Sequence, residues 1–244
     1  MRTIKLTIEY DGTLYHGWQV QPGLVTIQGV VQDCLARILG HPVYVQGAGR
    51  TDAGVHAIGQ TAHFRCESKH SSAVIMRALN ALLPDDIVIR QAEDVHPSFH
   101  AQFDAKEKEY RYYLLCQPER SAFFRRYALF VPTPLDLDQM RNALARIVGR
   151  HDFFSFSTAG DERENTVRTI TSADIGQEGH LVAITVRGEG FLHKMVRRIV
   201  GTLLEVGRGR MGADQITQIL QARDKRLAGP SAPPHGLFLM SVRY

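Results

Sequence analysis

The fold is decided by residues 3–39, which read TIKLTIEY (3–10), DGTLYHGWQVQPG (11–23) and LVTIQGVVQDCLARIL (24–39). Apolar and polar residues alternate along 3–10, which is the period of a half-buried strand. Thr26 is a suitable helix N-cap, apolar residues recur at helical spacing from Ile27 to Leu39, and Gly40 is a stop signal. The stretch therefore predicts a strand, a long loop and an amphipathic helix.

The rest of the chain repeats this alternation of strands and helices. Strands are predicted at 42–46, 55–64, 86–95, 106–116, 167–174, 181–187 and 236–244. Helices are predicted from Ser71 or Ser72 to about 83, and at 137–148, 191–206 and 214–222. The polar segment 157–165 predicts a mobile loop.

The pattern indicates an α+β fold rather than a parallel α/β fold, because no long βαβ series is present. LARIVG at 144–149 matches LARILG at 35–40 in five of six positions, which fits two similar halves. We therefore expect two RRM-like α/β halves with mostly antiparallel sheet and an active-site cleft at their seam, near 97–105. The expected domains are 1–100, with the loop described below, and 101–244, which is basic and completes the cleft.

Composition and cysteine usage exclude several classes of protein. The 244 residues are 44% hydrophobic and 22% charged, as in ordinary globular domains, which excludes disorder, collagen and coiled coil as descriptions of the whole. No apolar run approaches the ~20 residues that span a bilayer, and the alternating start is unlike a signal peptide. Cys34, Cys66 and Cys116 are odd in number and far apart, so no disulfide framework is indicated. We expect a cytoplasmic protein with reduced thiols.

Charge is unevenly distributed along the chain. Residues 1–105 hold 8 Lys and Arg against 10 Asp and Glu, whereas residues 106–244 hold 21 against 15. Of the cations, 23 are arginine, whose planar fork suits phosphate and base edges. The bias also fits genome composition, but a basic second half favours a polyanionic partner.

The densest chemical signal is GAGRTDAGVH at 47–56. A dinucleotide fingerprint is disfavoured, because Asp52 would push a carboxylate toward the pyrophosphate and no helix follows. Alternatively the loop presents Asp52 itself, with Arg50 close enough to pair with it and favour the ionised form. An ionised, positioned Asp can serve as nucleophile or base. A simple turn-stabilising Asp remains the other interpretation.

Histidine spacing gives no support for a metal. His56, His63 and His70 lie seven residues apart, so on a strand they would face alternate sides. His96 and His100 show no HExxH-type pattern. We therefore expect no metal.

Eight blocks in order resemble the TruA family of tRNA pseudouridine synthases. They are EYDGTLYHGWQVQ (9–21), GAGRTDAGVHA through GQTAHF (47–64), ALNALLPDDI (78–87), SFHAQFDAKEKEYRYYL (98–114), HDFFSFS (151–157), TVRTI (166–170), GFLHKMVRRIVGTLLEVGRGR (190–210) and APPHGLFLMSVRY (232–244). A single block would be weak evidence, but eight in family order over nearly the whole length are highly specific.

The resemblance implies a cofactor-free isomerase that converts uridine to pseudouridine in the tRNA anticodon arm, at tRNA positions 38–40. Asp52 falls on the family's catalytic aspartate and Tyr110 on its active-site tyrosine. Arg50 and Arg197 fall on basic residues associated with that aspartate. Gln102 replaces the arginine usual in the family, which affects one RNA contact and no catalytic role. The resemblance also implies a homodimer that shares one tRNA.

The residues taken alone also allow purely structural roles and two other functions. Tyr110 also fits a core strand tyrosine, and Arg197 also fits a solvated arginine beside the apolar face of its helix. A silent RNA-binding module of two RRM-like halves is a second possible function, although the RNP1 signature is absent. A hydrolase with an Asp nucleophile is a third, but no second carboxylate or metal is evident near Asp52.

Overall fold

The computed structural model describes residues 1–158 and 165–244. It divides into two compact units, one of Met1–Lys106 with Phe238–Tyr244 and one of Glu107–Leu237. The first unit takes in the last strand, and the expected division into domains 1–100 and 101–244 stays a prediction. The last strand belongs to the first unit because Phe238 and Leu239 pair in parallel with His56 and Ala57.

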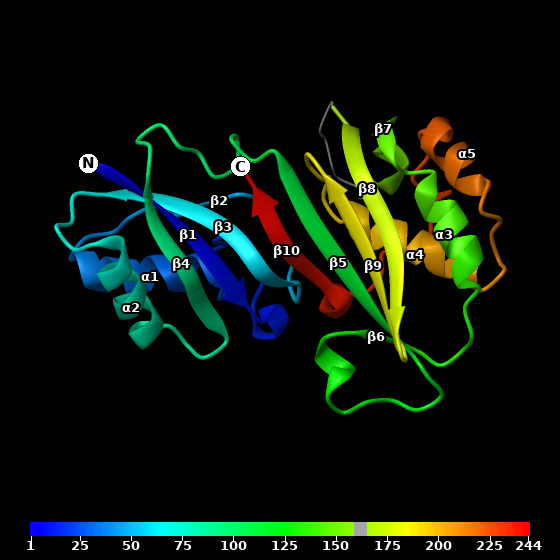
Figure 1. Ribbon diagram of the computed structural model, residues 1–244, viewed down its shortest axis with the longest axis horizontal. Helices are drawn as coiled ribbons and strands as arrows, with labels where there is room; N and C mark the ends of the chain where they lie inside the picture. Colours follow the sequence, from blue (N-terminus) through cyan, green and yellow to red (C-terminus); the bar gives the residue numbers. More distant parts are fainter. Residues whose placement is uncertain (159–164) are drawn as a thin grey trace. The chain divides into compact units, whose positions relative to one another are not determined.

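The sheet of the first unit has the order β4-β1-β3-β10 (Figure 1). Its strands are β1 (Arg2–Tyr10), β3 (His56–Cys66), β4 (Ile87–Val95) and β10 (Leu237–Arg243), with the short β2 (Gln46–Gly47) beside β3. β1 is antiparallel to both of its neighbours. Its alternate residues Ile4, Leu6, Ile8 and Tyr10 are buried, as the period of two predicted.

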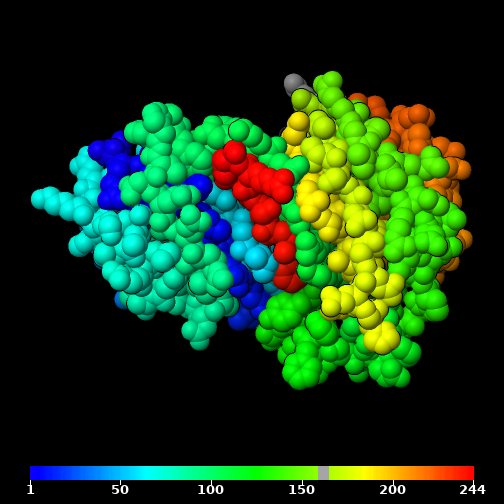
Figure 2. Space-filling model, in the orientation of Figure 1, coloured from blue at the N-terminus to red at the C-terminus, as the bar shows by residue number. Residues whose placement is uncertain are grey.

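Two helices supply the rest of this core, α1 (Ile27–Leu39) and α2 (Ser72–Leu82). The Thr26 side chain accepts the Gly29 N–H, and Gly40 closes α1 with a positive φ of 77°, so both predicted ends are confirmed. α1 lies behind the sheet in Figure 1, and side chains of β10 are at the surface on the face drawn in Figure 2.

The strand predicted at 42–46 is wrong except at its end. The Val45 N–H donates to the Gln32 side chain at 3.1 Å, and the Val45 carbonyl accepts from the Gln28 side chain at 2.8 Å. Two glutamines of α1 therefore satisfy the main-chain groups that a strand would offer to a neighbour.

The sheet of the second unit has the order β5-β9-β8-β7. Its strands are β5 (Glu107–Cys116), β9 (Leu181–Gly188), β8 (Val167–Glu178) and β7 (Gly149–Asp152), with β6 (Leu129–Val131) parallel to β5. The other pairs are antiparallel, and β8 and β9 form the predicted pair. Of the loop predicted at 157–165, residues 159–164 lie outside the described residues.

The second unit has three α-helices within its described part, α3 (Leu137–Ala145), α4 (Met195–Gly207) and α5 (Gln215–Ala222). α4 buries one apolar face, which includes Ile199, Val200 and Leu203. It begins later than predicted because Lys194 has a left-handed φ of 57°. α3 ends early, because the N–H groups of residues 146–148 bond three residues back rather than four.

The predicted fold class is confirmed, since the strands are mostly antiparallel and are mixed with helices in both units. That the two halves are similar to each other, and that a cleft lies at their seam, stay predictions.

Candidate functional site

The loop around Asp52 is a hydrogen-bonded turn between β2 and β3. The Val55 N–H donates to the Asp52 carbonyl at 3.1 Å, and Gly54 has a φ of 74°. Asp52 therefore takes the first position of a four-residue turn whose third residue needs the left-handed region. Its side chain is half-buried, and Thr51 before it is buried.

Residues 10–18, which we call the cradle, pack against this loop. They belong to the block EYDGTLYHGWQVQ (9–21). The Trp18 N–H donates to the Thr51 carbonyl at 3.1 Å, and the Gly54 N–H donates to the Tyr15 carbonyl at 3.3 Å. The Tyr10 hydroxyl lies 2.8 Å from the Thr51 hydroxyl. The backbone is thus fixed on both sides of Asp52.

Gly17 allows this close approach. Its φ is 85°, and a Cβ there would lie 2.5 Å from the Thr51 carbonyl oxygen and 3.0 Å from the Asp52 carbonyl carbon. No side chain fits at that distance. The glycine in the GTLYHGW part of the first block is therefore required by the position of Asp52, which the sequence alone did not indicate.

His56 joins the cradle to the start of β3. Its Nδ1 accepts the Gly12 N–H at 3.0 Å and also lies 3.1 Å from Asp11 Oδ1. The ring nitrogen therefore contacts both a backbone N–H and a carboxylate at the start of the 3-10 turn Gly12–Leu14. Its ring stacks on Phe238 at a centroid distance of 4.6 Å. His56 is a structural partner of the loop.

Tyr10 is held in its neutral form. Burial raises the pKa of its phenol above the usual range, and the hydrogen bond from Thr51 opposes this only in part. The phenol therefore stays protonated and contributes no charge near the loop.

Arg50 lies on the exposed side of the loop. The pairing of Arg50 with Asp52 stays a prediction. The side chain is directed to solvent, where a polyanion can reach it.

Tyr110 lies in the second unit, on β5, where it pairs with Val186 of β9. It exposes 8% of its surface, and its ring meets Phe191 edge to face at a centroid distance of 5.0 Å. This packing fixes the orientation of the ring. The structure therefore gives Tyr110 the surroundings of a core tyrosine with a narrow exposed part.

Arg197 is half-buried on α4 and is not a solvated helix arginine. Its Nε donates to the Ala232 carbonyl at 2.7 Å, and the Ala232 N–H donates to the Arg197 carbonyl at 2.9 Å. It also lies close enough to Tyr112 for its charge to oppose the rise in the pKa of that phenol that burial causes. Arg197 thus holds the segment before β10 against α4.

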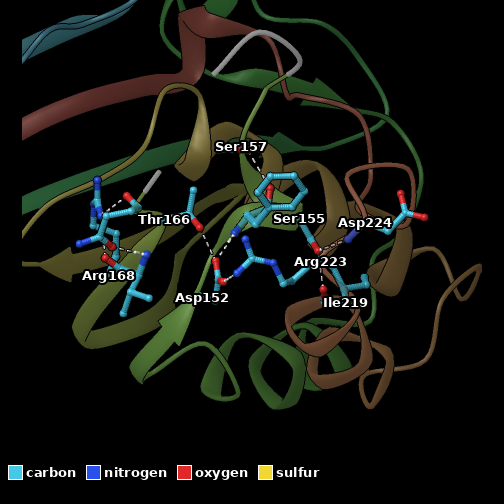
Figure 3. A network of polar contacts seen from close by, with 11 residues as sticks. Asp152, Ser155, Ser157, Thr166, Arg168, Ile219, Arg223 and Asp224 are labelled. Atoms are coloured by element: carbon cyan, nitrogen blue, oxygen red, sulfur yellow. Dashed lines mark hydrogen bonds and ion pairs between the residues drawn. The ribbon is translucent and has the colours of Figure 1, made fainter. Parts of the chain in front are cut away.

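A polar network that sequence reasoning missed ties together two of the quoted motifs in the second unit (Figure 3). Asp152 accepts hydrogen bonds from the Thr166 hydroxyl and pairs with the Arg223 guanidinium. Ser155 donates to the Ile219 carbonyl at 2.6 Å. The HDFFSFS and TVRTI blocks are therefore joined to the end of α5, and this role is structural. No local spacing could reveal it, because the partners are far apart in sequence.

Within residues 1–158 and 165–244, no three His, Cys, Asp or Glu side chains lie close enough together to hold a metal ion. In the same part of the chain, no helix has the length and hydropathy needed to cross a membrane.

Comparison with known proteins places the chain in a family. The family model described as tRNA pseudouridine synthase matches residues 6–104 and 143–244. The chain belongs to the tRNA pseudouridine synthase family. The matched ranges include Asp52, Arg50 and Arg197, whereas Tyr110 lies between them.

Curated members of the family match over the full length. A tRNA pseudouridine synthase A of Exiguobacterium sp. is 48% identical over 244 residues, which cover 100% of this chain and 98% of that protein. One of Geobacillus sp. is 47% identical, with the same coverage of both chains. One of Thermoanaerobacter sp. is 41% identical and covered completely.

Proposed function

We propose that this chain converts uridine to pseudouridine in tRNA, at positions 38–40 of the anticodon arm, with Asp52 as the catalytic carboxylate. The observation that carries the proposal is the fixed turn at Asp52 in a chain of this family. The carboxylate has its backbone held on both sides, so its position is set before substrate arrives.

The reaction needs no external reagent. The N1–C1′ glycosidic bond breaks, the uracil rotates, and a C5–C1′ bond forms; a proton leaves C5 and one is gained at N1. A positioned carboxylate serves three routes, namely attack at C1′, attack at C6, and removal of the C2′ proton. The proposal holds for each of them.

The other site residues act on the RNA. A base within a stem is inaccessible, so the uridine has to be flipped out of the stack. Arg50, which is exposed, fills the vacated stack or guides the base. Tyr110 contacts the uracil with the exposed part of its ring. Arg197 supports the site through its hydrogen bond to the Ala232 carbonyl, which holds the segment before β10.

Mapping pseudouridine in an unmodified tRNA transcript after incubation with the protein tests this function. We expect new pseudouridine in the anticodon arm. Tight binding with no pseudouridine would favour the silent RNA-binding module, and abasic sites or strand cleavage would favour a hydrolase.

Two substitutions at Tyr110 separate its possible roles. Tyr110→Ala removes the ring, so the rate of pseudouridine formation should fall by about 5- to 150-fold, the range for one lost stacking contact. Tyr110→Phe keeps the ring. A near wild-type rate for Phe assigns stacking, and a slow rate assigns to the hydroxyl a part in moving the C5 proton. Thermal melts control for lost packing against Phe191, and a fully active Ala variant would refute both roles.

We propose further that the protein is a homodimer that shares one tRNA. A compact chain of this length has a radius of gyration of only about 18 Å, which is small beside an L-shaped tRNA. A two-fold dimer doubles the basic surface. Light scattering should therefore report about twice 27.4 kDa. Mixed dimers of Asp52→Asn subunits and subunits with arginines changed to glutamate should recover activity, and a fully active monomer contradicts the proposal.

The proposal places the protein in the cytoplasm with its tRNA substrate. Cys34, Cys66 and Cys116 are all free thiols, as expected for that compartment.

A further inference from the structure

The connection between β5 and β6 carries a concentration of exposed aromatic side chains in the second unit. Phe123 exposes 87% of its surface, Phe124 39% and Tyr127 38%. Every residue from 118 to 127 except Ser121 is exposed. We call residues 118–127 the aromatic–arginine turn; they lie in the green part of the chain that projects beyond the end of β5 in Figures 1 and 2.

The turn has a defined backbone structure. The Ser121 hydroxyl accepts the N–H groups of Phe123 and Phe124 at 3.2 and 3.3 Å. The Phe124 carbonyl then accepts from Tyr127 and Ala128, at 2.9 and 3.0 Å. The short 3-10 turn Phe124–Arg126 thus holds its rings in solvent, although burying one phenylalanine would stabilise the fold by about 1.5–3 kcal/mol. We therefore infer that the exposed rings serve to contact a binding partner.

The charge of the turn indicates what binds it. Arg120, Arg125 and Arg126 stand against one acid, Glu119. Arg120 and Arg125 form no ion pair with any described residue. Aromatic faces flanked by guanidinium groups match a nucleic-acid strand, whose bases stack on rings and whose phosphates bind arginine. The turn of a second copy fits less well, because packing the turn against its own copy would bring the same arginines face to face.

We propose that the aromatic–arginine turn is an RNA-docking site that stacks unpaired bases of the tRNA on Phe123 and its neighbouring rings, with phosphates held by Arg120 and Arg125. The proposal rests on the proposed function for its ligand. It adds a contact outside the Asp52 loop, and the turn lies between the two ranges that the family model matches, 6–104 and 143–244.

The test compares two exposed aromatics. Phe123→Ala should weaken binding of an unmodified tRNA transcript by about 5- to 150-fold at fixed salt, the range for one lost base-stacking contact. Tyr44→Ala is the matched control, because Tyr44 is 62% exposed in the first unit with no arginine beside it in sequence. The Tyr44→Ala variant should bind the transcript with wild-type affinity. Phe123→Tyr keeps the aromatic face and should restore the affinity.

Two further measurements complete the test. Arg125→Gln should lower the slope of log affinity against log salt by about one, as expected for a lost phosphate contact. Light scattering of Phe123→Ala should give the wild-type mass. An unchanged Kd for Phe123→Ala overturns the proposal, and so does a halved mass, which would assign the turn to contact between copies.

The outcome is separable from that of the proposed function. If wild-type protein forms pseudouridine in tRNA while Phe123→Ala binds like Tyr44→Ala, only the docking site is refuted. If wild type binds tRNA through Phe123 and forms no pseudouridine, the docking site stands and the proposed activity is refuted.

Discussion

Asp52→Asn should lower the rate of pseudouridine formation by more than about 10³-fold, the scale of loss when an enzyme's reacting group is removed. The substitution is isosteric, so the turn should persist, because the main-chain hydrogen bonds of Thr51, Asp52 and Gly54 do not involve the side chain that is changed. What is lost is the negative charge and the basicity of the side chain. Single-turnover assays with saturating protein would measure the chemical step directly.

Asp33→Asn is the matched control for this prediction. Asp33 is exposed on α1, and its substitution by Asn removes one negative charge from the same unit. Both variants should bind tRNA with nearly equal affinity and melt near the wild-type temperature, while only Asp52→Asn loses turnover. Near wild-type pseudouridine formation by Asp52→Asn would show that another group performs the chemistry.

Local signals predicted the elements whose ends are set by their own residues. Thr26 and Gly40 bound α1 because a cap and a left-handed glycine act within one turn of the helix. The error at 42–46 arose because glutamines of α1 bond to Val45, a contact that strand periodicity does not encode. The late start of α4 follows from the backbone of Lys194, which the helical pattern also does not report.

The sequence singles out Asp52 as a candidate, but it does not predict which residues fix the backbone around it. Glycine density and the resemblance to a family directed attention to Asp52. The residues that hold it, Tyr10, Trp18 and Gly17, lie more than thirty residues earlier in the sequence, and their contacts are largely main-chain hydrogen bonds, which leave no side-chain signature. The Arg50–Asp52 pair was inferred from spacing alone and stays a prediction; Arg50 itself is exposed.

Gly17→Ala should lower the turnover rate by about 100-fold without touching any reacting atom. The added Cβ would lie 2.5 Å from the Thr51 carbonyl oxygen, so either segment 10–18 or the Asp52 turn has to move. A displacement of about 1 Å at a catalytic group is enough for a loss of this size. The effect should appear in kcat at saturating tRNA, since the backbone that carries Asp52 is what shifts.

Gly23→Ala separates displacement of the turn from backbone strain. Gly23 also has a positive φ, 72°, but a Cβ there meets nothing within 4 Å. Both alanines incur the left-handed penalty of about 1–2 kcal/mol, so both should lower the melting temperature. Only Gly17→Ala adds the collision with Thr51, so only it should lose turnover, provided that the assay is run below both melting temperatures. Equal activity of the two variants would mean that the cradle does not position Asp52, because the strain is shared and the collision is not.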